Sequence, residues 1–107
     1  MMKKLLLIAG CAALMAGGAT WAGNPAAGKE KSKTCAACHG PDGNSATPDF
    51  PRLSGQYYNY LTKALADYKS GERKNAIMAP MAASLSKADI DDLAAYYSRQ
   101  SGLAVKY

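Results

Sequence analysis

Two stretches of the chain place apolar residues at the spacing of an α-helix. The first follows residues 54–55 and ends at Gly71, and the second lies between Ser86 and Gly102. Ser86, with Asp89 three residues later, forms the pattern of a capping box, which marks the start of a helix. The apolar positions are Tyr57, Tyr60, Leu61, Ala64, Leu65 and Tyr68 in the first stretch and Ile90, Leu93, Ala94 and Tyr97 in the second. Both stretches are therefore predicted to be helices with one buried face.

Another helix is expected near residue 25, although its apolar face is weak. Asn24 can cap it, Pro25 suits the first helical position, and Gly40 lies just past its expected end near Ala37. No segment alternates apolar and polar residues as a half-buried strand would. The pattern predicts an all-α domain with three main helices.

Two long irregular segments separate these predicted helices. Residues 40–54 contain three prolines, and residues 71–85 contain Met78, Pro80 and Met81. We expect Pro80 to prevent a regular helix through the two methionines, so that their side chains need not share a face. Loops of this length in a small domain need something to order them. Three short helices without an evident core therefore suggest a large buried ligand.

The first 22 residues have the layout of a secretory signal peptide. Two lysines precede an apolar run over residues 5–16, and small residues follow it. This run is shorter than the ~20 residues that a membrane-spanning helix needs. We predict cleavage after Ala22 and a mature periplasmic domain of residues 23–107, with no transmembrane span. The four residues ending at Cys11 leave an alternative, because they resemble a lipoprotein signal that would anchor the protein through a lipid on Cys11.

The charge and size of the mature chain narrow its possible partners. The formal net charge is +5, and loss of Lys3 and Lys4 with the signal leaves +3. This mild positive charge suits docking on an acidic patch of a partner protein. No arginine-rich stripe with interleaved aromatic residues is present, so nucleic acid is not expected as a partner. The 85 residues that remain of 107 are few for a self-sufficient core, which is consistent with a stabilising cofactor.

The segment Cys35-Ala36-Ala37-Cys38-His39 is the strongest chemical signal in the chain. A thioredoxin-like dithiol would require a preceding strand, and none is predicted. A structural zinc site would require a second pair of ligands, yet the mature chain has no cysteine or histidine beyond these three. The spacing C-x-x-C-H is the signature of covalent haem attachment, in which the two thiols add to the haem vinyl groups. We therefore predict one haem c attached through Cys35 and Cys38, with His39 as an axial ligand of the iron.

The other axial ligand cannot be a histidine, because His39 is the only one. The mature chain contains two methionines, Met78 and Met81, and both lie in the second irregular segment. A thioether opposite histidine raises the reduction potential of a haem iron. Either methionine could supply it.

Several motifs together resemble those of a class I c-type cytochrome. They are "CAACHGPDGNS", "PDFPRLSGQYYNYL", "MAPMAASLS" and "DIDDLAAYYSRQ", and they span nearly all of residues 25–101. The chain is most similar to the short bacterial monohaem type, whose fold also forms each half of certain dihaem cytochromes c. The resemblance implies an all-α class I fold of three main helices and two long loops around one haem. It also implies that Met78 is the axial ligand, with Met81 as the alternative.

The resemblance assigns further residues around the haem. Pro48 matches the proline whose carbonyl accepts the Nδ1 proton of the axial histidine, a bond that fixes the ring. Gly28 and Tyr96 match the glycine and aromatic residue where the first and last helices cross. Ser32 and Thr34 depart from the pattern, because apolar residues are frequent there. Candidates for contact with a haem propionate are Arg52, Tyr57 and Tyr60.

The predicted function is one-electron transfer in the periplasm. Membrane respiratory complexes, a terminal oxidase or periplasmic dehydrogenases are the expected partners, and the protein is not expected to be an enzyme. A small haem peroxidase or a gas-binding sensor remains an alternative, and either would need a labile sixth ligand on the iron.

Overall fold

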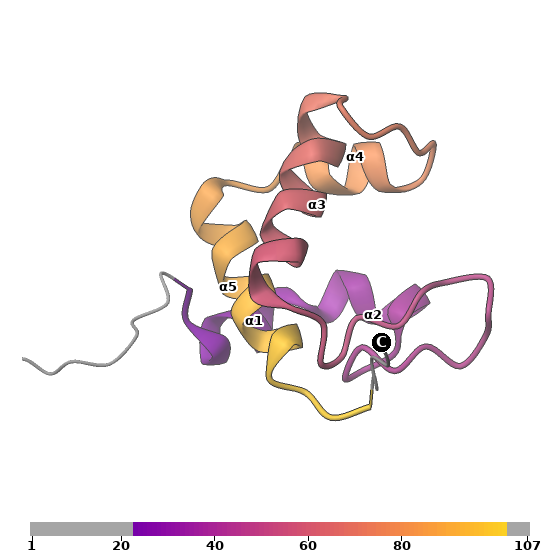
Figure 1. The fold of residues 1–107 in the computed structure, drawn as a ribbon, viewed down its shortest axis with the longest axis vertical. Coiled ribbons are helices and arrows are strands. Elements are labelled where there is room, and N and C mark those ends of the chain that lie inside the picture. Colours follow the sequence, from indigo (N-terminus) through magenta and orange to yellow (C-terminus); the bar gives the residue numbers. More distant parts are fainter. Residues whose placement is uncertain (1–22, 103–107) are drawn as a thin grey trace, which may run out of the picture.

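The computed structural model describes residues 23–102, and this part of the chain contains five helices and no strand. They are α1 (Pro25–Lys31), α2 (Lys33–His39), α3 (Tyr58–Ser70), α4 (Met78–Ala83) and α5 (Lys87–Ser98). In Figure 1, α3 and α5 stand side by side, α4 lies against α3, and α2 lies at the other end of the molecule. The all-α prediction is confirmed. The predicted signal segment, with Cys11, lies outside the described residues.

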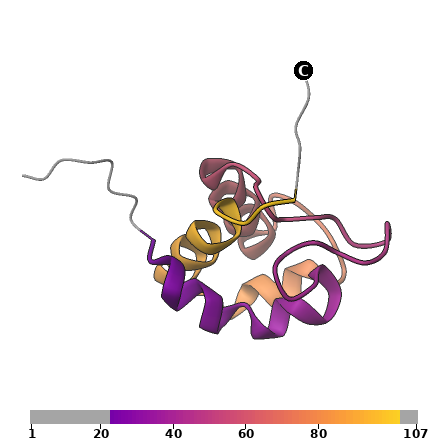
Figure 2. The ribbon, with the colours of Figure 1, turned by 90° about the horizontal axis from the view of Figure 1, so that it is seen from below.

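The crossing of α1 and α5 is the most extensive contact between the described helices (Figure 2). Gly28 lies at this crossing, where a β-carbon would overlap the carbonyl group of Asp92 and crowd the β-carbon of Tyr96. The expected pairing of Gly28 with Tyr96 is therefore confirmed. The Lys31 ammonium group strengthens the crossing, because it lies 2.8 Å from a carboxylate oxygen of Asp89 and 2.6 Å from one of Asp92.

The first predicted helix proves to be two helices separated by Ser32. The Ser32 hydroxyl donates a hydrogen bond of 2.7 Å to the carbonyl oxygen of Lys29, and its backbone N–H bonds the carbonyl oxygens of both Gly28 and Lys29. A serine that bonds the backbone three residues earlier competes with the regular helical pattern. The helical region also continues two residues past Ala37 and ends at His39. The next residue, Gly40, has a positive φ of 87°. The departure at Ser32 therefore divides the helix.

The two strongly patterned helices follow their predictions. Gly71 ends α3 with a left-handed conformation, and Ser86 and Asp89 form the capping box of α5. The core lies between these helices and α1, and it consists of Leu61, Leu93, Ala94, Tyr96 and Tyr97. It is small, because Leu93 is the only large apolar side chain of the described residues that is fully enclosed. No helix in residues 23–102 has the length and hydropathy to cross a membrane.

The prediction for the second irregular segment is wrong in part, because residues 78–83 form α4. Pro80 is the third residue of this helix. The first N–H groups of a helix have no partner within it, so a proline there costs no hydrogen bond. Instead, the Asn75 side chain accepts hydrogen bonds of 2.9 Å from the backbone N–H groups of Ile77 and Met78. Because Met78 and Met81 are three residues apart on one helix, they occupy neighbouring positions on its surface.

Candidate haem and electron-transfer site

Helix α2 carries the three residues of the C-x-x-C-H segment. Cys35, Cys38 and His39 follow one another at intervals of three and one residues, so the helix presents them from adjacent turns. Both thiols are half-buried and neither is in a disulfide, while the His39 side chain is buried, with 7% of its surface exposed. Among the helices that the structure describes, α2 contacts only α1. Of the three, Cys35 also packs against the core residues of α3 and α5.

The His39 ring is held by the returning end of loop 40–54. Its Nδ1 atom lies 2.8 Å from the carbonyl oxygen of Pro51, so Pro51, and not the predicted Pro48, is the acceptor. The loop explains the difference, because the N–H of Leu53 donates a 2.8 Å hydrogen bond to the carbonyl oxygen of Gly43 and brings Pro51 back over α2. Pro48 lies exposed farther out in the loop.

This bond decides which nitrogen of His39 can bind a metal ion. A carbonyl oxygen can only accept, so Nδ1 carries the proton and donates it. The lone pair of Nε2 is then available for a ligand, as in most metal-binding histidines. The Phe50 ring meets the imidazole edge-on at 6.4 Å between centroids and restricts its rotation.

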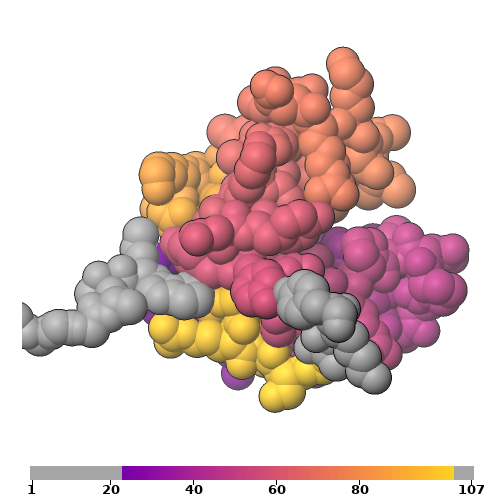
Figure 3. All heavy atoms as spheres, in the orientation of Figure 1, coloured from indigo at the N-terminus to yellow at the C-terminus, as the bar shows by residue number. Residues whose placement is uncertain are grey.

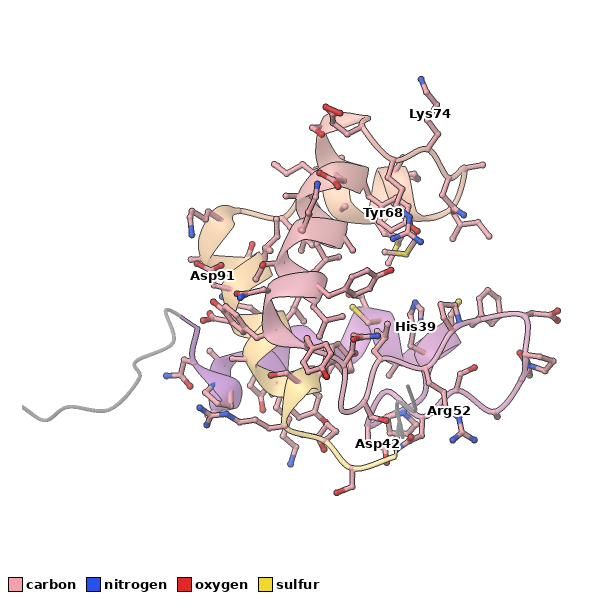
Figure 4. The ribbon with its side chains drawn as sticks, viewed as in Figure 1. His39, Asp42, Arg52, Tyr68, Lys74 and Asp91 are labelled. Carbon is pink, nitrogen blue, oxygen red and sulfur yellow. The ribbon has the colours of Figure 1, made fainter. Side chains whose placement is uncertain are left out.

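Helix α4 carries the two methionines on the opposite side of a recess. Met78 is partly buried, whereas Met81 is 41% exposed. Among the described helices, α4 contacts only α3, so it does not touch α2. The space-filling view shows the recess between residues 71–83 and the part of the chain that includes α2 and loop 40–54 (Figure 3). In Figure 4 the His39 ring rises from α2 toward the side of the molecule that carries Tyr68 and α4.

Tyr97 also belongs to this region. The sequence predicted that it lies on the buried face of its helix, but not that it lies near Cys35. Its hydroxyl lies beside Ser32 and Cys35, yet it is buried and makes no hydrogen bond of good geometry with the described residues. Burial raises the pKa of Tyr97, and burial likewise raises the pKa of the Cys35 thiol. Both groups are therefore neutral at pH 7. The small side chain of Ser32 leaves room for the phenol group of Tyr97.

These features fit a covalently held haem. Two thiols and an imidazole with a free Nε2 lie on α2, and a thioether lies on α4. The two helices hold these groups without packing against each other, and the core beside them is small for the size of the chain. A flat, largely apolar group between α2 and α4 would supply the buried surface that the side chains do not. Among the described residues, no cluster of three or more histidine, cysteine or acidic side chains forms an alternative metal site.

The three candidates for propionate contact are exposed side chains. Tyr57 is 60% exposed, and Tyr60 is 49% exposed with its hydroxyl accepting a hydrogen bond from Arg73. Arg52 is exposed and lies on the same side as Asp42, whose pKa is lowered by hydrogen bonds from Asn44 and also by the charge of Arg52 (Figure 4). A propionate contact therefore stays a prediction for all three.

A large cavity lies elsewhere. It has a volume of about 1370 Å³ and runs along α3 and α5, where Tyr58, Lys63 and Asp91 are among its lining residues. None of Cys35, Cys38, His39 and Met78 lines it. The volume of this cavity therefore does not indicate where the candidate haem-binding groups lie.

The fold and the site together define a c-type cytochrome, and the chain belongs to the cytochrome c family, whose sequence profile matches residues 25–99. It is 50% identical over 82 residues to cytochrome c-554(548) of Halomonas halodenitrificans, covering 74% of this chain and 99% of that protein. The structure of reduced cytochrome c4 from Pseudomonas stutzeri superposes with a TM-score of 0.72 at 44% identity, over 76% of this chain and 47% of that one. A third relative is the thiosulfate dehydrogenase electron acceptor of Thiomonas intermedia, 38% identical over 92% of this chain and 44% of that protein.

The family membership confirms the predicted class I fold, the haem c cofactor and the role in electron transfer rather than enzymatic catalysis. The chain spans almost all of the Halomonas relative but less than half of the other two proteins.

Proposed function

We propose that this protein is a periplasmic one-electron carrier that holds one haem c between α2 and α4. Cys35 and Cys38 would form the thioether bonds, and His39 and Met78 would be the axial ligands. The observation that carries the proposal is that α2 and α4 present these groups across a recess without contacting each other. The single C-x-x-C-H segment supports one haem for each chain.

Each of these residues has a defined task in the proposed site. The bond from Nδ1 of His39 to the Pro51 carbonyl group keeps Nε2 unprotonated and its ring fixed, which favours a stable bond to iron in both oxidation states. Met78 is preferred over Met81 because it is the less exposed of the two side chains on α4. When bound, the haem supplies the one-electron exchange between Fe(III) and Fe(II), and the Met78 thioether favours the reduced state. Arg52, Tyr57 and Tyr60 remain candidates for the propionates.

The expected partners are proteins that deliver or accept single electrons. The name of the Thiomonas relative supports a dehydrogenase as donor, and a membrane respiratory complex or a terminal oxidase would then be the acceptor. The secretory signal predicted over residues 1–22 supports a periplasmic location, with lipidation of Cys11 as the tethered alternative. The mildly basic net charge supports docking on acidic surfaces.

The absorption spectrum of the purified holoprotein tests the ligand set. A low-spin ferric spectrum with a sulfur-to-iron charge-transfer band at long wavelength is the expected result, together with slow binding of carbon monoxide to the ferrous form. A high-spin ferric spectrum and rapid carbon monoxide binding would show an open sixth position, and the peroxidase or gas-sensor alternative would replace the carrier.

A further inference from the structure

The segment that connects α3 to α4 is anchored to α3 by the side chain of Arg73. One terminal nitrogen of the guanidinium group (Nη1) donates a 3.1 Å hydrogen bond to the Tyr60 hydroxyl, and its central carbon lies 4.8 Å from the centroid of the Tyr68 ring. The backbone N–H of Arg73 also donates a 3.1 Å bond to the carbonyl oxygen of Asp67. Arg73 thus contacts α3 at three points although it belongs to an exposed loop.

The geometry suits arginine in particular. Tyr60 and Tyr68 are eight residues apart, slightly more than two helical turns, so they lie along one side of α3. A planar guanidinium group can stack on one ring while it donates to the hydroxyl of the other. A lysine ammonium group could keep the attraction to the ring but has no flat face to stack.

The anchored segment leads directly to Met78. Asn75 lies midway between Arg73 and Met78, and its side chain bonds the N–H groups that open α4. At the far end of α4, the Lys69 ammonium group donates a 2.9 Å hydrogen bond to the carbonyl oxygen of Ala83. Because α4 contacts no described helix except α3, its position depends on packing against α3 and on these side chains of α3 and its loop.

We propose that Arg73 is a positioning residue that holds Met78 in place for the iron. This inference rests on the proposed function, because it assumes that Met78 is the axial ligand. When Arg73 releases Tyr60 and Tyr68, residues 71–77 can move away from α3 and take the Met78 thioether with them. Met78 would then no longer be held where it could bind the iron of a bound haem, and the sixth position would become accessible to an external ligand.

The test compares the holoprotein with the Arg73→Leu and Lys74→Leu variants. Lys74 is the neighbouring cation, its side chain points away from the molecule (Figure 4), and it makes no hydrogen bond or ion pair with the residues that the structure describes. Lys74→Leu therefore removes the same charge from the same loop without touching α3.

Two quantities are measured. The first is the rate of carbon monoxide binding to the ferrous form. The second is the temperature at which the ferric sulfur-to-iron band disappears, relative to the midpoint of helix unfolding followed by circular dichroism.

In Arg73→Leu the carbon monoxide rate should rise about tenfold, the change expected from losing an exposed cation–π contact together with one hydrogen bond. The sulfur-to-iron band should be lost well below the unfolding temperature of the helices. Arg73→Lys should recover part of both effects, and Lys74→Leu should match the parent protein.

A carbon monoxide rate in Arg73→Leu equal to that of Lys74→Leu would overturn the proposal. So would a loss of the band that coincides with unfolding, because Arg73 would then contribute only to overall stability. Met78→Ala separates the two proposals: if it keeps the band, the ligand assignment itself is wrong. If Met78→Ala loses the band while Arg73→Leu behaves as the parent, only the role of Arg73 is wrong.

Discussion

His39 and Met78 lie on opposite sides of the recess, and the chain holds them by different means. The His39 ring is fixed by a backbone carbonyl group, that of Pro51, in a loop that closes on itself through Gly43. Met78 lies on a six-residue helix that packs against α3 and whose position depends in addition on side chains, those of Lys69, Arg73 and Asn75. Backbone contacts survive most substitutions, whereas each side-chain contact can be lost by one.

The two sides of the proposed site should therefore have different roles. The side of Cys35, Cys38 and His39 would determine whether the haem is present. The side of Met78 would determine how tightly the sixth position is closed, and hence the potential and the access of small molecules. Segments with few buried contacts open more readily than the rest of a domain, so substitutions on the two sides should have different consequences.

The largest effect is expected from removing both thiols on the His39 side. Cys35→Ala combined with Cys38→Ala should give a chain without covalent haem. Because the described core contains only one large, fully enclosed apolar side chain, this chain should also fail to fold stably. Extraction with acidified acetone, followed by circular dichroism of the variant, checks both parts. A folded double variant would show that the helices do not depend on the ligand.

Removing the thioether should change the site without removing the haem. Met78→Ala should retain covalent haem and helix content, but its ferric spectrum should become high-spin and its reduction potential should fall. Met81→Ala is the matched control from the same helix. It should keep the low-spin spectrum and lose only about 1 kcal/mol of stability, since Met81 is 41% exposed. If the two spectra were exchanged, Met81 would be the ligand.

Acid should weaken the crossing of α1 with α5. Hydrogen bonds from Lys31 lower the pKa of Asp89 to about 2 and also lower the pKa of Asp92. A carboxylate whose pKa is depressed on folding adds stability above its unfolded pKa of about 3.8, and this contribution is lost as the pH falls toward 2. The unfolding temperature should therefore decrease between pH 4 and pH 2.

Lys31→Gln tests the origin of this acid sensitivity. The variant removes the positive charge that both carboxylates share, so its unfolding temperature should depend less on pH in the same range. The sulfur-to-iron band at neutral pH should be unchanged, because Lys31 supports the crossing of α1 with α5 and not α4. An unaltered pH dependence in Lys31→Gln would assign the acid sensitivity to other carboxylates.

The two sides also differ in how far the sequence predicted them. The C-x-x-C-H motif identifies Cys35, Cys38 and His39 because the chemistry of attachment requires them at fixed local spacing. The acceptor for His39 was predicted at Pro48 and found at Pro51, because the choice among three prolines depends on how loop 40–54 closes. That closure is a tertiary property that no local pattern encodes.

On the Met78 side the sequence predicted the methionines but not their support. The sequence predicts that Pro80 prevents a regular helix, but at the third position of α4 the proline costs no hydrogen bond. The asparagine three residues before Met78 was a recognisable capping signal that could have indicated a helix start. No local sequence pattern indicated the contacts that Arg73 and Lys69 make with distant residues. Amphipathic helices α3 and α5, by contrast, followed their apolar pattern closely.

The smallest expected effect is also the most local, and it concerns Asn75. Its side-chain oxygen accepts from the N–H groups of Ile77 and Met78, each at 2.9 Å, so Asn75→Ala leaves both donors to water. Loss of a helix cap costs about 1 kcal/mol.

Ser86→Ala is the matched control, because it removes the cap of α5, which belongs to the core rather than to the ligand loop. Ser86→Ala should lower the global unfolding temperature and leave carbon monoxide binding unchanged. Asn75→Ala should do the reverse, raising the carbon monoxide rate several-fold with little change in global unfolding. Equal effects of the two variants on global unfolding would show that α4 opens only when the whole domain does, and the distinction between the two sides of the site would then not hold.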